Sequence, residues 1–262
     1  MSRGLCFFLV AALSFPQGAW AQMQPHRAEY SLRLGTAANA PRIGTAMQDI
    51  TLDCTGWHIR RDVSSEMSFT PSWKVSLASK LDGEEQRDGS GFRYHAIQIN
   101  NGSKSETEGK VHRTAGETRA EIVSPNGPAQ LILPPSTLMP VAALSRLVDR
   151  LRAKSGSFPT VMFGAEAIGD AFRVDVQELD PDALRAAPRA IKPVVVPATQ
   201  FWPVSMTFRR DRQQDQIPLF SVSAMVFDSG VLDRLTIDVG IVTVAADLKA
   251  LEMHRAPACP DS

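Results

Sequence analysis

The chain has 262 residues, 44% of them hydrophobic, and its 28 basic and 28 acidic side chains leave no net charge. This balance gives no electrostatic reason to expect nucleic acid or an anionic membrane as a partner. A chain of this length and composition can bury a full core, either as one large β domain or as two smaller units.

The first 21 residues have the pattern of a secretory signal peptide. Arg3 precedes an apolar run from Leu5 to Phe15, and the segment closes on the small-x-small cleavage site Ala19-Trp20-Ala21. The apolar run is too short to cross a bilayer. We therefore expect residues 1–21 to be cleaved and no membrane-spanning segment to remain.

Cleavage before Gln22 would leave residues 22–262 as the mature chain, which we expect to be a single domain in the periplasm. One arginine is removed, so 27 basic and 28 acidic side chains remain. Cys6 is removed as well; it precedes the apolar run and is badly placed for lipid attachment. Two cysteines are then left in an oxidising compartment.

From His26 to Ile132, apolar and polar residues alternate in short segments, as in strands that bury one face. The clearest segments are residues 28–34, 59–69, 73–81, 92–99 and 129–133. Asp-Gly or Asn-Gly occurs in "LDGEE", "RDGSG", "NNGSKS" and "SPNGPA", and these dipeptides tolerate the positive φ of hairpin turns. The pattern predicts a mainly β protein with an antiparallel meander.

One principal helix is predicted at about residues 139–154. Apolar residues recur there at i, i+3, i+4 and i+7, namely at Leu144, Leu147, Val148 and Leu151. Ser136 or Thr137 can cap the start, Pro140 suits the first turn, and Gly156 suits a left-handed stop.

Strand composition returns after the helix, in residues 160–164, 171–179, 201–210, 219–228, 231–240 and 242–252. The segment from Asp180 to Thr199 contains four prolines and interrupts this pattern. We expect it to be a long surface excursion, with at most one helical turn at residues 181–187.

No arrangement of residues favours catalysis. The G-x-S-x-G motif of many serine hydrolases is absent. His58 follows Cys54 by four residues, which on a strand separates the two by about 13 Å, too far for a thiol and its base. We therefore expect no catalytic residue.

The five histidines are scattered singly, without HExxH, CxxC or H-x-H spacing. We expect no metal site and no cofactor, and we interpret each histidine as a surface or hydrogen-bonded strand residue. These histidines are His26, His58, His95, His112 and His254.

Two further groups of residues have ordinary structural explanations. Glu84 and Glu85 fall in a predicted hairpin turn, where solvation is the default. Seven aromatic residues suit a β core, although a curved sheet with an apolar concave face could also bind a lipid or peptide. The seven are Trp57, Trp73, Phe201, Trp202, Phe208, Phe220 and Phe227.

Several segments occur in an order that resembles a known family. These are "HRAEYSLRL", "CTGW", "LPPSTLMP" at the helix entry, "FWPVSMTF", "GVLDRLTIDVG" and a Leu-x-x-Leu-Glu ahead of Cys259. Together they resemble the cell envelope integrity protein EipB family, periplasmic proteins of alphaproteobacteria, over roughly His26 to Cys259. The resemblance implies a single antiparallel β-spiral, an open barrel-like sheet holding one helix. It also implies an internal disulfide bond between Cys54 and Cys259.

The resemblance further implies a non-catalytic role in envelope integrity and stress resistance. Such a protein, expected to be a monomer, would bind a partner: a periplasmic tetratricopeptide-repeat protein, an envelope lipid or a lipoprotein. An alternative is an acyl-chain or lipoprotein carrier with a half-open barrel. A hydrolase is the third hypothesis.

Overall fold

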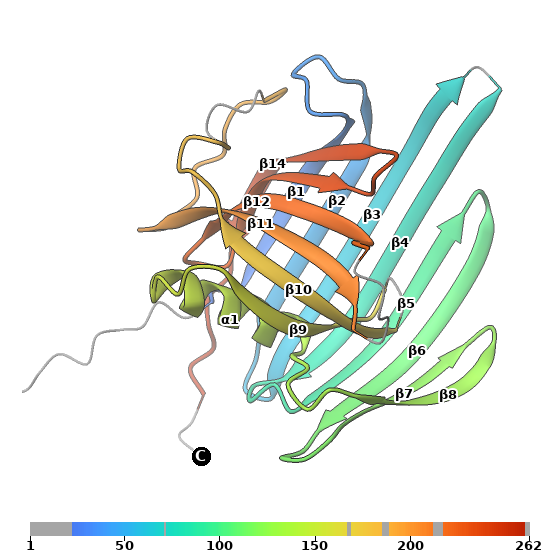
Figure 1. Cartoon of the computed structure of the whole chain (residues 1–262), viewed down its shortest axis with the longest axis vertical. Coiled ribbons are helices and arrows are strands. Elements are labelled where there is room, and N and C mark those ends of the chain that lie inside the picture. Colours follow the sequence, from blue (N-terminus) through green and yellow to red (C-terminus); the bar gives the residue numbers. More distant parts are fainter. Residues whose placement is uncertain (1–22, 71, 167–168, 185–188, 212–216, 260–262) are drawn as a thin grey trace, which may run out of the picture.

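The computed structural model describes residues 23–70, 72–166, 169–184, 189–211 and 217–259. The predicted signal peptide and part of the predicted helical turn at 181–187 lie outside these residues. The described residues form one sheet of fourteen antiparallel strands and one helix (Figure 1). None of the helical residues in this part of the chain makes a segment long and apolar enough to cross a membrane.

The first eight strands precede the helix α1 (Pro140–Arg152). They are β1 (His26–Leu34), β2 (Arg42–Leu52), β3 (Gly56–Thr70), β4 (Trp73–Gln86), β5 (Gly91–Asn100), β6 (Ser103–Arg113), β7 (Thr118–Ser124) and β8 (Gly127–Leu133). Six more follow it: β9 (Phe158–Gly164), β10 (Asp170–Glu178), β11 (Phe201–Arg210), β12 (Phe220–Phe227), β13 (Leu232–Asp238) and β14 (Thr243–Met253).

Strands that are consecutive in sequence pair with each other, except for β8 and β9, and the first strand, β1, also pairs with the last, β14. This pairing joins the two meanders and leaves β8 and β9 at opposite edges of the sheet. The sheet then coils until the edges approach each other. Leu138, just before the helix, accepts from the amide of Phe163 and donates to the carbonyl of Val161, both at 2.9 Å. The predicted open, barrel-like antiparallel sheet with one helix is confirmed.

Aromatic side chains fill the interior where strands β9 and β10 lie over β3–β5 (Figure 1). The rings of Phe92 and Tyr94 are stacked with centroids 5.5 Å apart, and Phe163 packs 5.6 Å from Tyr94. Phe208 and Phe220 form a second stack at 4.4 Å. This part of the spiral is therefore a packed core.

Trp73 was expected in that core, and this expectation is wrong. It begins β4 at the tip of the long β3–β4 hairpin and is 57% exposed. The hairpin reaches beyond the neighbouring strands, away from the aromatic stacks (Figure 1).

The predicted turn at "LDGEE" is also wrong, because Asp82 and Gly83 lie inside β4. A Cβ atom on Gly83 would lie 2.7 Å from the ring of Phe92 on the next strand. The glycine thus makes room for an aromatic ring and does not bend the chain. The other three turns occur as predicted, between β4 and β5, β5 and β6, and β7 and β8.

Strands β2, β6 and β7 were missing from the segments expected from the sequence. In β6, the inward positions before Val111 include Ser105, Thr107 and Gly109. These small and polar residues give no apolar alternation. A Cβ atom on Gly109 would lie 2.3 Å from the ring of Tyr94, so the glycine leaves room for this aromatic ring.

Helix α1 begins one residue after its predicted start and ends two residues before its predicted end. Pro140 occupies its first turn as expected. Neither Ser136 nor Thr137 caps it. The N-cap residue is Met139, which offers no side-chain hydrogen bond. The hydroxyl of Thr137 instead donates to the carbonyl of Pro134 at 2.7 Å.

The Pro-rich excursion contains no strand within its described residues. Two buried carboxylates attach it to the sheet. Arg189 forms an ion pair with Asp233, and Asp228 accepts hydrogen bonds from the amides of Thr199 and Gln200.

Candidate functional site

The two mature cysteines form a disulfide bond at one end of the spiral. Cys54 lies in the turn between β2 and β3, and Cys259 lies beyond β14, with their Cα atoms 5.5 Å apart. The bond is the one that the family resemblance implies, and it links positions 205 residues apart. A sulfur held in this bond offers no free thiol for nucleophilic attack.

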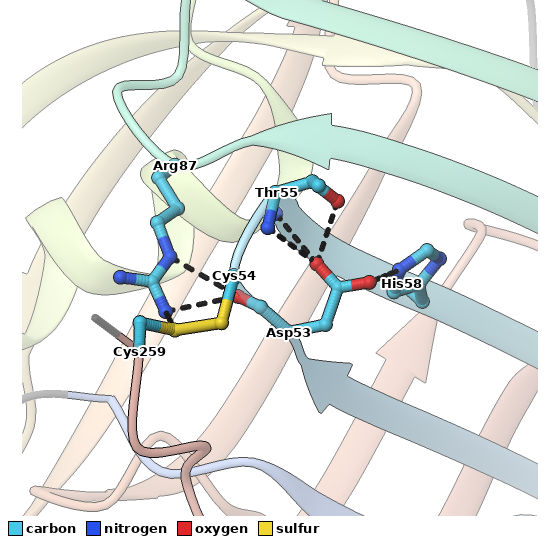
Figure 2. The surroundings of a disulfide bond; sticks show 7 residues. Asp53, Cys54, Thr55, His58, Arg87 and Cys259 are labelled. Atoms are coloured by element: carbon cyan, nitrogen blue, oxygen red, sulfur yellow. Dashed lines mark hydrogen bonds and ion pairs between the residues drawn. A yellow bond between two sulfur atoms is a disulfide. The ribbon is translucent and has the colours of Figure 1, made fainter. Parts of the chain in front are cut away.

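Asp53 organises the turn that carries Cys54 (Figure 2). Its carboxylate accepts from the Thr55 hydroxyl at 2.6 Å, from the Thr55 amide at 2.7 Å and from the Gly56 amide at 2.9 Å. His58 lies 2.6 Å away on the other carboxylate oxygen. The pKa of Asp53 is held well below its usual range. The hydrogen bond from the Thr55 hydroxyl contributes most, followed by those from His58 and the two amides. His58 is therefore a partner of Asp53 and not of the cysteine.

Arg87, in the turn between β4 and β5, attaches a second hairpin to the disulfide (Figure 2). Its Nε and Nη2 donate to the carbonyl of Asp53 at 3.1 and 2.9 Å, and Nη2 lies 3.2 Å from the sulfur of Cys259. The same arginine lines a cleft of about 1000 Å³ between helix α1, this turn and strands β9 and β10. The disulfide bond thus lies beside one rim of that cleft.

The cleft has an apolar wall and several cationic groups. The apolar side chains include Leu52, Trp57, Leu138, Phe158 and Val161. The arginines are Arg87, Arg113, Arg146, Arg150 and Arg173, and the carboxylates are Glu85, Asp88, Asp149 and Asp211. A concave site of this size that combines apolar side chains with polar groups is a candidate ligand site, and this one is rich in charged groups.

Glu85 closes the inner end of the cleft and caps the helix. It is only 2% exposed, and its carboxylate oxygens accept from the amides of Val141 at 2.7 Å and Ala142 at 2.8 Å. These are first-turn amides, which have no partner within a helix and favour negative charge. Burial raises the pKa of Glu85 to about 7, while the two amides and Arg113 act in the opposite direction.

The prediction of a solvated pair, Glu84 and Glu85, is wrong for Glu85. Both residues lie in β4, where neighbours point to opposite faces. Glu84 is exposed and pairs with Arg93, whereas Glu85 points inward to the helix.

In the part of the chain that the structure describes, the arginines of the cleft form no ion pair with its carboxylates, although the charge of Arg113 acts on Glu85 and Asp88. Within the described residues, the guanidinium groups of Arg113 and Arg146 have no hydrogen bond or ion pair. Arg150 lies over the ring of Phe158, 5.3 Å from its centroid, and Arg173 is 3.7 Å from Asp175 outside the cleft.

Three of the four carboxylates have other partners. Glu85 caps the helix, Asp88 accepts from the amide of Ser90 at 2.9 Å, and Asp149 pairs with Arg152 at 3.5 Å. The guanidinium donors of Arg113 and Arg146 are therefore available to a ligand.

A second hollow, of about 1310 Å³, lies on the outer face of strands β2–β8. Its charged side chains alternate in sign and pair across the strands, as Arg60 with Asp82 at 3.4 Å and Arg93 with Glu84 at 2.5 Å. This is the pattern of a solvated sheet face, with its charges already matched.

Four of the five histidines have partners, and His26 and His254 lie near each other beside Asp49. His26 is buried and bonds the Gln24 carbonyl, His58 pairs with Asp53, His95 with Glu106 and His254 with Asp49. No group of three or more His, Cys, Asp or Glu side chains in the described part of the chain is placed to hold a metal ion.

Comparisons with known proteins agree with this architecture. The model of the EipB-like family matches residues 17–255. The cell envelope integrity protein EipB of Brucella abortus is 22% identical over 249 residues, which cover 89% of this chain and 85% of that protein.

A crystal structure of a beta-barrel-like protein of a domain of unknown function, also from Brucella abortus, matches with a TM-score of 0.72 at 19% identity. The match covers 89% of this chain and 99% of that one, so the two proteins share a fold. Since the family model spans most of the sequence, the chain belongs to the EipB-like family.

Proposed function

We propose that this protein supports the integrity of the cell envelope from the periplasm, by binding a partner molecule without catalysis. The observation that carries the proposal is its membership of the EipB-like family, together with the name of its relative, a cell envelope integrity protein. The signal-peptide pattern of residues 1–21 and the disulfide bond support an oxidising compartment.

The cleft beside the disulfide is the proposed binding site. The stacked rings of Phe92 and Tyr94 occupy the interior of the spiral, whereas the cleft is open and holds two guanidinium groups without a hydrogen bond or ion pair among the described residues. A protein partner, for which the family resemblance points to a tetratricopeptide-repeat protein, would dock over the same rim.

The carrier of acyl chains is the second candidate. The apolar wall formed by Trp57, Leu138 and Val161 supports this candidate. The bound acyl chain would then lie in the cleft and not inside the spiral.

Complementation tests the proposed function. The gene is deleted, and sensitivity to detergent is measured in cells that carry the wild-type chain, Ser145→Trp or Ser103→Trp. Ser145 of α1 lines the cleft, so a tryptophan there fills it, whereas Ser103 is exposed at the start of β6, away from the cleft.

The wild-type chain and Ser103→Trp are expected to restore resistance, and Ser145→Trp to fail at equal abundance in the periplasm. Full complementation by Ser145→Trp would show that the cleft is not the site. A deletion strain as resistant as its parent would contradict the envelope role.

A further inference from the structure

The cationic side of the cleft contains two arginines whose guanidinium donors are unused among the described residues. Arg113, at the end of β6, is partly buried and acts on Glu85 and Asp88 only through its charge, and Arg146 is exposed on α1. Within the described residues neither guanidinium group has an ion pair or hydrogen bond. A guanidinium presents a planar set of donors that matches carboxylate and phosphate oxygens.

The N-terminus of the helix does not provide the anion site, because Glu85 already occupies it. Its two oxygens accept from the amides of Val141 and Ala142. An incoming anion would be repelled there and drawn to the arginines. The position of a bound head group is therefore set by Arg113 and Arg146.

The apolar side of the cleft limits the ligand further. Trp57 and Val161 are only partly buried, and Leu138 lies beside them. A small inorganic anion in a cavity of about 1000 Å³ would leave this wall in water. A neutral lipid would cover the wall and leave the arginines without counter-charge.

We propose that the cleft binds a single-chain amphiphile whose anionic head group contacts Arg113 and Arg146 and whose acyl chain lies along Trp57, Leu138 and Val161. This inference rests on the proposed binding function and names the chemistry of its ligand.

The test uses the mature chain with its disulfide bond intact. Trp73→Phe and Trp202→Phe leave Trp57 as the sole tryptophan of residues 22–262, so its fluorescence reports on the apolar wall. Four probes are titrated at concentrations where they stay monomeric: dodecanoate, dodecyl phosphate, dodecyl maltoside and inorganic phosphate. The first two share the proposed chemistry, the third has the chain without the charge, and the fourth has the charge without the chain.

Dodecanoate or dodecyl phosphate is expected to change the fluorescence of Trp57 saturably, and the stronger of the two identifies the head group. In Arg113→Gln/Arg146→Gln the affinity should fall at least about tenfold, because two charge-assisted contacts are lost. Arg119→Gln is the matched control: Arg119 is exposed on β7 outside the cleft, and its loss should change affinity by less than about twofold. Near-ultraviolet circular dichroism confirms the fold of each variant; if the double variant is misfolded, the exposed Arg146→Gln alone carries the test.

Equal affinity for dodecyl maltoside, or unchanged affinity in the arginine variants, would overturn the anionic head group. Inorganic phosphate binding as tightly as dodecyl phosphate would overturn the acyl chain. If no probe binds while Ser145→Trp still fails to complement the deletion, the inference about the ligand falls and the proposed function stands. Binding of the anionic probes together with full complementation by Ser145→Trp would uphold the ligand and show that the envelope role does not depend on the cleft.

Discussion

The arginines inside the spiral and those of the cleft have opposite environments. Arg33 of β1 is buried against Asp247 of β14, with Nη2 and Nε at 2.9 and 3.1 Å from one carboxylate oxygen. Arg189, in the Pro-rich excursion, forms an ion pair with the buried Asp233, through Nη2 alone among the described residues. Arg113 and Arg146 lie in a cavity beside four carboxylates, and no carboxylate among the described residues contacts either of them.

The buried, ion-paired arginines stabilise the fold, whereas the cleft arginines are available to a ligand. A buried cation must be neutralised, since desolvation of an isolated charge costs more than the fold can sustain. An arginine at the rim of a cleft retains water and remains stable without a partner. The interior pairs should therefore control stability, and the cleft arginines should control binding.

The largest expected effect comes from breaking an interior pair. Asp247→Asn leaves Arg33 buried beside an uncharged amide, and the free energy of unfolding should fall by about 3–5 kcal/mol. Urea denaturation measures it. Asp82→Asn is the control, because Asp82 pairs with Arg60 at 3.4 Å on the exposed face and should matter by about 1 kcal/mol or less. Equal losses in the two variants would remove the distinction between interior and surface pairs.

The disulfide bond should have the next largest effect. Cys54→Ser frees the end of the chain from the β2–β3 turn and should lower the free energy of unfolding by about 2–4 kcal/mol. Since no activity is assigned to the thiol, the variant should keep its affinity for an anionic amphiphile at temperatures where it is folded. Peptide mapping without reductant should find Cys54 joined to Cys259; two free thiols in periplasmic material would contradict the structure.

Glu85 should make stability depend on pH. Its pKa in the folded protein is raised to about 7 from an ordinary value of 4.5, so the folded state holds the proton more tightly. The stabilisation is fully present below pH 4.5 and is lost as the pH rises through 7. Between pH 5 and pH 8 the free energy of unfolding should therefore fall by about 2–3 kcal/mol from this group.

The substitution Glu85→Gln removes the titrating group, so it should flatten the stability profile across this range. Glu84→Gln, at the adjacent exposed position, should leave the profile unchanged. A profile that keeps its slope in Glu85→Gln would assign the dependence to another group.

The smallest effect on stability is expected in the cleft. Arg113→Gln breaks no ion pair within the described residues and removes only an electrostatic attraction to Glu85 and Asp88, so the free energy of unfolding should change by about 1 kcal/mol or less. Thermal unfolding measures it. A loss as large as that of Asp247→Asn would show that Arg113 is part of the folded core.

Local patterns in the sequence identified much of the fold. Helix α1 followed from the spacing of Leu144, Leu147 and Val148, and the β5–β6 turn from Asn101-Gly102. Both depend on neighbouring residues, which a sequence displays directly. Gly83 was wrongly predicted to form a turn, because the ring that requires a glycine there, that of Phe92, belongs to another strand.

The candidate site was harder to predict. Glu85 caps a helix 56 residues later in the chain, and nothing near it in the sequence marks that partner. The cleft gathers Arg87, Arg113, Arg146 and Arg173 from four elements, and only the coiling of the sheet brings them together. The two cysteines could be matched because their even number and the family resemblance left one pairing.

The most direct test of the contrast between interior and cleft arginines is an NMR titration of the arginine Nε–Hε resonances with dodecyl phosphate. The resonances of Arg113 and Arg146 are predicted to shift saturably, while those of Arg33 and Arg189 stay in place. Shifts confined to outer-face arginines such as Arg60 and Arg93, or shifts of equal size in all of them, would contradict the account.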